Sequence, residues 1–269
     1  MSESSEQVVR RATAAFNAGR PDQARRLCEQ GLRRAPADPM LNHLLAAVLF
    51  AGGEHDPARR HVEVSLAARP DHAAAHLLAG RIARAEQRYD DALAHLDRAI
   101  AMAPQREGFV EKARTLDQAG QREAARAAWR AILEIVPQQK EAAARLGRIA
   151  WEDGDPAGAE KLLERAVAGE APASAWFDLG LARQDLRDFD GAAAAYRRAR
   201  ELRPDHAEAA LNLGIVVQEA GDLAAAMRAY ADAYRLRPAM FGAIAMALTS
   251  SPHGRLWLDE TALRRSLGG

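Results

Sequence analysis

The 269-residue sequence is poor in several features that other classes of protein need. Cys28 is its only cysteine, which excludes an intrachain disulfide and favours a reducing, cytosolic compartment. Lysine plus arginine and aspartate plus glutamate both number 37, so no net charge attracts nucleic acid or an anionic membrane. No apolar run reaches the ~18–20 residues of a membrane span, and no signal-peptide pattern follows the first charges. These absences predict a cytoplasmic protein that binds no nucleic acid and has no membrane span.

Aromatic residues make up only 5% of the sequence, and lysine occurs three times. Alanine is abundant instead, with 63 residues, and arginine carries the basic character. Alanine has the highest helix propensity, whereas the β-branched and aromatic residues that favour strands are sparse. The composition predicts an all-α protein, and this alanine and arginine usage is typical of a GC-rich bacterium.

An internal repeat of 33–34 residues runs through the sequence. The pentapeptide RPDHA occurs at 69–73 and again at 203–207, an offset that four such repeats would give. Prolines keep the same period at Pro36, Pro70, Pro104, Pro137, Pro204 and Pro238. Seven alanines mark it most sharply: Ala24, Ala58, Ala92, Ala125, Ala159, Ala192 and Ala226.

Two further positions accompany each of these alanines. Twelve residues earlier there is always a small residue, which we call the small position: Ala12, Ala46, Gly80, Ala113, Gly147, Gly180 and Gly214. Four residues later there is a larger apolar residue, which we call the large position: Cys28, Val62, Leu96, Trp129, Leu163, Tyr196 and Tyr230. Small side chains let two antiparallel helices approach closely, and the large residue fills the groove beside them. Each repeat is therefore predicted to be a helix hairpin.

The boundaries of these hairpins also have sequence signals. Glycines that can adopt the left-handed conformation are expected to end the first helices at Gly19, Gly53, Gly120, Gly154 and Gly221. Asp71 and Asp205 follow prolines and are expected to be the N-caps of the next first helices.

Residues 176–204 show the unit most completely, with Trp176, Leu179, Gly180, Ala192, Tyr196, Ala199 and Pro204. This pattern, W-x2-L-G followed by A-x3-Y-x2-A-x4-P, resembles the tetratricopeptide repeat family. The resemblance covers about residues 5–238 as seven repeats, although the first and fourth lack the leading Trp-x2-Leu-Gly and Ala171 replaces the fifth closing proline. It implies a right-handed α-solenoid, or superhelix, of antiparallel helix pairs whose first helices line a concave groove.

The two ends lie outside the repeats. Residues 1–4 are expected to be disordered. Residues 239–269 are expected to form C-terminal capping helices and a tail, because a terminal repeat otherwise exposes one apolar face. A sharper alternative is that the apolar triplet Leu256-Trp257-Leu258 docks on a partner or on a second copy.

No residue pattern supports catalysis or a cofactor. The sequence has no phosphate-binding glycine loop and no Gly-x-Ser-x-Gly. His72 and His76 are four residues apart, but no further ligand completes a metal site. Cys28 occupies a large position, so we expect a buried packing residue and not a nucleophile. We predict a protein that is not an enzyme and needs neither metal nor cofactor.

Function must then lie in the first-helix side chains that hairpin packing leaves free. One residue after the small position, three successive repeats carry arginine, at Arg81, Arg114 and Arg148. The predicted partner-binding groove combines these with apolar, basic and acidic neighbours: Phe16, Phe50, Arg84, Arg145, Trp151, Asp178, Gln184 and Asn212.

We expect this groove to bind a protein or peptide, with an acidic stretch over the arginines, because the guanidinium engages carboxylates bidentately. The alternative is that the arginines pair within the chain, with Glu111, Asp117 or Glu152. The carboxylate clamp of chaperone-binding relatives is not supported, since Val9 and Thr13 stand at its positions. The scaffold hypothesis has two rivals: a self-assembling structural protein, and an accessory subunit of a bacterial transferase or secretion machine.

Overall fold

The computed structural model describes residues 4–250 and 260–268, and every regular element in these residues is a helix. The chain divides into two compact units, Met1–Ile132 and Leu133–Gly269.

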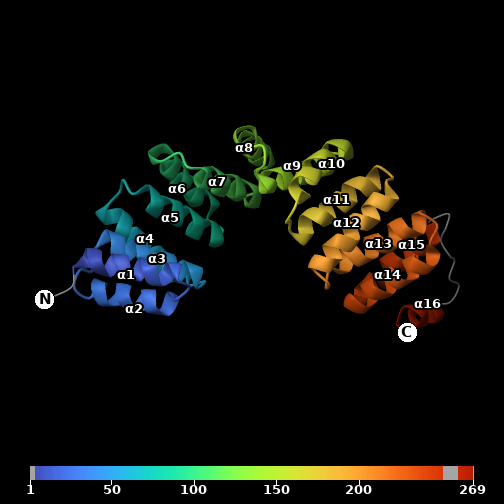
Figure 1. Cartoon of the computed structure of the whole chain (residues 1–269), viewed down its shortest axis with the longest axis horizontal. Helices are drawn as coiled ribbons and strands as arrows, with labels where there is room; N and C mark the ends of the chain where they lie inside the picture. The colour runs from blue at the N-terminus through green and yellow to red at the C-terminus, as the bar shows by residue number, and fades with distance from the viewer. Residues whose placement is uncertain (1–3, 251–259, 269) are drawn as a thin grey trace. The chain divides into compact units, whose positions relative to one another are not determined.

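The first unit is a series of helix hairpins (Figure 1). In the first three hairpins an odd-numbered first helix packs against the even-numbered second helix that follows it, and in the fourth Trp129 of the second helix donates a hydrogen bond to Asp117 of the first. The helices are α1 (Ser5–Asn17), α2 (Pro21–Leu32), α3 (Pro39–Ala51), α4 (His55–Ala68), α5 (Ala73–Ala85), α6 (Tyr89–Met102), α7 (Arg106–Gln118) and α8 (Arg122–Ile135), whose last residues pass the boundary between the units.

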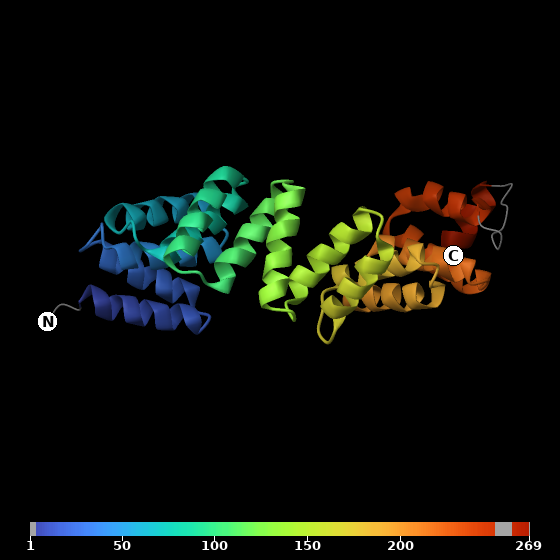
Figure 2. The same cartoon turned by 90° about the horizontal axis from the view of Figure 1, so that it is seen from above.

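The second unit continues the same alternation, and Figure 2 shows its ribbon as helices joined by short turns. Its elements are α9 (Lys140–Glu152), α10 (Pro156–Val167), α11 (Ala173–Asp185), α12 (Phe189–Leu202), α13 (Ala207–Glu219), α14 (Leu223–Leu236), a 3-10 turn (Pro238–Met240), α15 (Phe241–Ser250) and α16 (Glu260–Gly268). The all-α solenoid of helix pairs predicted from the repeat is confirmed.

The three repeat positions form the contact inside each hairpin. All seven marker alanines have no exposed surface, and every large position from Cys28 to Tyr230 is buried. The approach is closest where the small position is glycine. A Cβ added to Gly180 would lie 2.4 Å from the ring of Tyr196, and one added to Gly80 would lie 2.7 Å from Leu96. Glycine is thus required wherever a leucine or tyrosine fills the groove.

The turns inside the hairpins need a left-handed residue, and the five predicted glycines supply it, with φ between 70° at Gly19 and 93° at Gly221. In the two remaining hairpins Gln87 and Arg187 adopt φ of 61° without being glycine. The expected N-caps were wrong by one residue: α5 and α13 begin after His72 and His206. Asp71 lies in the preceding turn, where it pairs with Arg69 instead.

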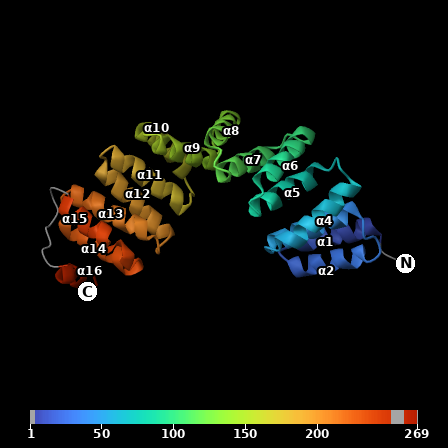
Figure 3. The ribbon, with the colours of Figure 1, turned by 180° about the vertical axis from the view of Figure 1, so that it is seen from behind.

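After the last repeat, α15 occupies the place of an eighth first helix and α16 packs against α14 (Figure 3). Leu263 and Leu267 of α16 are buried in a cluster with Tyr230, Ile244 and Leu248. Residues 1–3 and the triplet Leu256-Trp257-Leu258, to which predictions were attached, lie outside the described residues. Among the helices that the structure describes, none has the length and apolar character needed to cross a bilayer.

Candidate partner-binding face

All the residues predicted for the groove lie on first helices, and they divide between the two units. We call the exposed side of the first helices in one unit its first-helix face. In the first unit this face includes Phe16 of α1, Phe50 of α3, Arg81 and Arg84 of α5, and Arg114 of α7. In the second unit it includes Arg145, Arg148 and Trp151 of α9, Asp178 and Gln184 of α11, and Asn212 of α13.

On the first unit, three arginines converge on one buried carboxylate. The side chain of Glu111 on α7 is only 3% exposed. Its Oε2 lies 2.9 Å from Nη2 of Arg84, and its Oε1 lies 2.8 Å from Nη1 of Arg114. Nε of Arg81 is 3.8 Å from the same Oε1. We call Arg81, Arg84, Arg114 and Glu111 the arginine cluster.

Two arginine side chains of this cluster stay accessible. Glu107 is a further carboxylate near it, with Oε1 3.5 Å from Nη1 of Arg81, and its side chain is 57% exposed. The side chains of Arg81 and Arg114 stay more than one-third exposed, so both remain open to solvent while Glu111 holds them in place. The alternative of intrachain pairing is therefore observed, and it leaves part of both side chains accessible.

An apolar surface adjoins the arginine cluster. The guanidinium carbon of Arg81 lies 5.5 Å from the centre of the Phe50 ring, within the range of a cation–π contact. Phe50 and Phe16 are both partly buried and pack against the core of the first unit. Each ring therefore packs against the core and also contributes to the face, and the Phe50 ring contacts Arg81.

On the second unit Arg148 is paired with two carboxylates. Nη1 of Arg148 lies 2.7 Å from Oδ1 of Asp178, and Nε lies 2.8 Å from Oε1 of Glu152. Its guanidinium also stacks 4.9 Å from the centre of the Trp151 ring, whose Nε1 donates a hydrogen bond of 2.8 Å to Asp185. Burial raises the pKa of Asp178, and the attraction of Arg148 opposes this rise. Acidic groups thus compensate the charge of Arg148.

A cavity of about 660 Å³ lies between α9 and α11 beside this pair. Lys140, Arg145, Arg148 and Asp178 are among its lining residues. Lys140 has a hydrogen-bond partner within the chain, because its Nζ donates a 2.9 Å hydrogen bond to the carbonyl of Glu170. The lining combines charged side chains of both signs with apolar ones such as Ala144 and Pro172.

Two predicted groove residues bond to the side chain of a buried tyrosine. The hydroxyl of buried Tyr196 donates a 2.8 Å hydrogen bond to Gln184, and Asn212 also bonds to this hydroxyl. The same link recurs twelve residues apart in other repeats, from Trp129 to Asp117 (2.8 Å) and from Tyr230 to Gln218 (3.0 Å). Sequence reasoning missed this link, although a polar residue twelve positions before a large-position aromatic donor is a signal that could have found it.

The predicted series Arg81, Arg114 and Arg148 has different surroundings in its two parts. Arg81 and Arg114 share Glu111, whereas Arg148 belongs to the second unit and has partners of its own. Glu111 was considered from sequence only as one possible ion-pair partner. Its role as the centre of a cluster depends on the packing of α5 against α7, which no local sequence pattern encodes.

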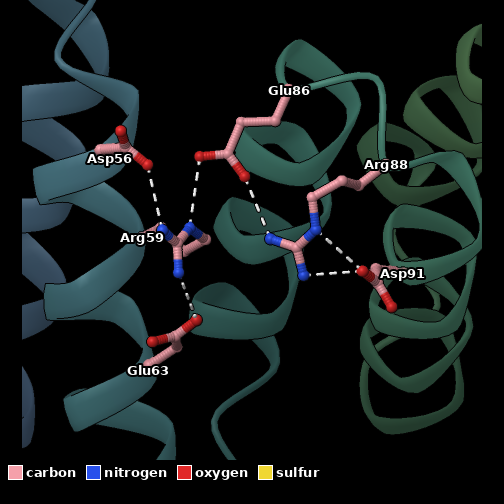
Figure 4. Close-up of polar contacts among 6 residues, drawn as sticks. All are labelled: Asp56, Arg59, Glu63, Glu86, Arg88 and Asp91. Atoms are coloured by element: carbon pink, nitrogen blue, oxygen red, sulfur yellow. Dashed lines mark hydrogen bonds and ion pairs between the residues drawn. The ribbon is translucent and has the colours of Figure 1, made fainter.

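A second charged network lies away from the first-helix face, where α4 meets the turn between α5 and α6 (Figure 4). Arg59 contacts Asp56 at 3.0 Å, Glu63 at 3.3 Å and Glu86 at 3.4 Å, and Glu86 reaches Arg88 at 3.0 Å. Here the carboxylates match or outnumber the arginines. The network connects the second repeat to the third and leaves no excess positive charge.

The residues considered for chemistry form no reactive site. Burial raises the pKa of Cys28 to about 12, so the thiol stays protonated at neutral pH. His72 and His76 do not point to a common ligand position, because Nδ1 of His76 lies 3.0 Å from Nδ1 of His95. In the described part of the chain, no group of three or more histidine, cysteine, aspartate or glutamate side chains has the geometry for a metal ion.

Comparison with known families agrees with the repeat pattern. Three sequence profiles, each described as tetratricopeptide repeat, match residues 15–82, 75–108, and 110–175 with 177–241. Together they cover most of the chain. No curated protein sequence matches it.

Solved structures share the fold at low sequence identity. PilF of Pseudomonas aeruginosa superposes with a TM-score of 0.66 at 17% identity, covering 74% of this chain and 91% of its own. PilW, described as a widely conserved type IV pilus biogenesis factor, gives 0.67 at 18% identity, with coverages of 81% and 100%. YrrB, described as a protein with an unusual peptide-binding site, gives 0.52 at 18% identity, with coverages of 68% and 95%. At these identities the likeness concerns the fold alone.

Proposed function

Because this chain belongs to the tetratricopeptide repeat family, we propose that it is a non-catalytic scaffold that binds a protein or peptide partner on its first-helix faces. The arginine cluster of the first unit carries this proposal. It presents two arginine side chains that are more than one-third exposed and that a buried carboxylate holds in position.

The partner that suits this surface is a segment rich in aspartate or glutamate. A carboxylate of the partner would replace water at Arg81 and Arg114 and form charge-assisted hydrogen bonds with both. Glu111 lowers the conformational entropy that these long side chains lose on binding, since it already restricts them. The apolar surface at Phe50 offers a contact for an aliphatic or aromatic group next to the acidic residues.

The test is the binding of a fluorescein-labelled peptide of six glutamates, measured by anisotropy with the full chain. We expect the double substitution Arg81→Gln and Arg114→Gln to weaken binding at least tenfold, and added salt to weaken binding to the unsubstituted chain. Arg60→Gln is the matched control, because Arg60 is an exposed arginine of the same unit on the second helix α4. An unchanged dissociation constant in a folded double variant would refute the acidic partner.

The self-assembly hypothesis rests on residues 239–269 and stays a prediction. The burial of Leu263 and Leu267 against α14 uses α16 inside the chain, which favours a capping role for this segment. Light scattering of the full chain and of a chain ending at residue 250 distinguishes the two roles. A cap predicts unchanged mass with lower stability, whereas an assembly segment predicts a fall in mass.

The third hypothesis, an accessory subunit of a bacterial transferase or secretion machine, concerns the identity of the partner. It is compatible with the same binding face. Recovery of partners from the native organism, with the Arg81/Arg114 double variant in parallel, tests both the hypothesis and the face. The cytoplasmic location expected from the sequence is proposed on the same terms and is tested by fractionation.

A further inference from the structure

Histidines gather in one part of the first unit, in the second and third repeats. Six lie on or next to the helices α3 to α6: His43, His55, His61, His72, His76 and His95. All are buried or partly buried. In the described part of the second unit the corresponding group is a single residue, His206.

The His76–His95 contact accepts only one arrangement of protons when both rings are neutral. Nε2 of His76 lies 3.0 Å from the carbonyl oxygen of Pro70, which can only accept, so Nε2 carries the proton. Nδ1 of neutral His76 is then an acceptor, and Nδ1 of His95, 3.0 Å away, must donate to it. If both rings are protonated, two N–H groups face each other and this bond between α5 and α6 is lost.

Three other histidines lie at contacts between neighbouring helices. His43 of α3 and His72 before α5 meet edge to face with centroids 4.8 Å apart. Nδ1 of His72 is buried without a hydrogen-bond partner, so a proton added there finds no acceptor. Nδ1 of His61 on α4 lies 2.8 Å from the side-chain oxygen of Asn42 on α3. The contacts α3–α4, α3–α5 and α5–α6 each include at least one histidine.

Nearby charges do not supply these rings with stable counter-ions. Arginines and carboxylates both lie near these rings. They are Glu29 of α2, Arg59, Arg60 and Glu63 of α4, Arg69 and Asp71 before α5, Arg88 before α6, and Asp91 and Arg98 of α6. Arg59 and Arg88 already hold the carboxylates of the network in Figure 4.

We propose that mild acid opens the α3–α6 hairpins of the first unit and so releases the partner from the arginine cluster. This proposal rests on the proposed function, because α5 carries both His76 and the arginines Arg81 and Arg84. When α5 loses its contacts with α3 and α6, the guanidinium groups of Arg81 and Arg84 are no longer held against Glu111 on α7.

The direction of the pH effect follows from the proton affinities. Burial lowers the pKa of His43 to about 4, against an ordinary value near 6.5. Burial is also the main cause that lowers the pKa values of His61, His72 and His95. Below pH 6.5 these histidines therefore bind protons more readily in the open form than in the closed form. Stability is full above pH 6.5 and falls as the pH drops through this range. Each such histidine multiplies the opening constant by about ten per pH unit.

Hydrogen exchange of the full chain, resolved by peptide and corrected for intrinsic rates, locates the effect. Between pH 7 and pH 5.5 we expect the opening constants of α3–α6 to rise at least tenfold more than those of α9 and α10, a hairpin without histidine. An equal change in both regions overturns the proposal.

His95→Gln sharpens the test. The glutamine amide can still donate to Nδ1 of His76 but does not titrate, so we expect about a tenfold smaller acid response in α3–α6 per pH unit. His72→Asn is a second variant if the first fails to fold. His206→Gln is the matched control, and it should leave the acid response of α3–α6 unchanged.

Partner release is measured separately, as anisotropy of the hexaglutamate peptide at pH 7 and pH 5.5. Binding at pH 7 that is lost at pH 5.5, and retained better in His95→Gln, supports the switch. Opening of α3–α6 with no binding at either pH refutes the acidic partner and leaves the acid response established. Binding that is equal at both pH values refutes the switch and leaves the partner assignment in place.

Discussion

The two units differ in the partners that surround the arginines of their first helices. In the first unit three arginines share the buried Glu111. In the second unit Arg148 has two carboxylates of its own and the ring of Trp151. The side chains of Arg81, Arg114 and Arg148 are exposed to nearly the same extent, 38%, 36% and 39%. The same position in a repeat therefore has different ion-pair surroundings in the two units, although its exposure is alike.

The sharpest way to break this comparison is to remove the central carboxylate of each unit. Glu111→Gln leaves three arginines around a neutral side chain. We expect the free energy of unfolding to fall by about 2–4 kcal/mol, because a buried charge pair is broken. Asp178→Asn should cost only about 1 kcal/mol, because Arg148 keeps Glu152. Hydrogen exchange in α5 and α7, compared with α9 and α11, measures both losses. Equal losses would mean that the two units do not differ as described.

A second comparison sets the aromatic repeats of the second unit against the leucine repeats. Gly180→Ala places a methyl group 2.4 Å from the buried Tyr196 ring, whereas Gly80→Ala meets Leu96 at 2.7 Å. Overpacking of this kind costs about 1–3 kcal/mol, and we expect the upper end for the rigid tyrosine ring. Thermal unfolding followed by circular dichroism should show the larger decrease for Gly180→Ala. The reverse order would show that leucine is the less adaptable neighbour.

The smallest expected effect concerns the link inside the repeat. Tyr196→Phe removes the hydroxyl that donates to Gln184 and leaves the ring in place. We expect a loss of about 1 kcal/mol, since one hydrogen bond is lost without a cavity. Urea unfolding of Tyr196→Phe, alone and combined with Gln184→Leu, measures the coupling between the two residues. Additive losses would indicate that the hydroxyl and the amide act independently.

The fold was predictable because its signal is repeated. Seven copies of the small and large positions fix the hairpins, and all seven marker alanines are buried as expected. The predicted start of α5 was wrong by one residue. Asp71 and His72 are both near the turn, and only the backbone decides which one caps the helix.

The candidate site was only partly predictable. Its residues were placed correctly on first helices, since that placement follows from helical geometry. The sharing of Glu111 and the diversion of Gln184 to Tyr196 depend on side chains that meet across helices. The sharing of Glu111 follows no period in the sequence, whereas the polar residue twelve positions before an aromatic donor recurs and could have been found. Their role in binding remains a prediction.

The link from Tyr196 to Gln184, and its counterparts at Trp129 and Tyr230, ties together two positions that lie twelve residues apart. A buried donor that loses its acceptor destabilises the hairpin, whereas a leucine at the large position needs no acceptor. In related chains, an aromatic donor at the large position should therefore occur together with a polar residue twelve positions earlier. Repeats with leucine there should be free to vary at that earlier position, and they are the repeats in which new binding specificities can arise at least cost.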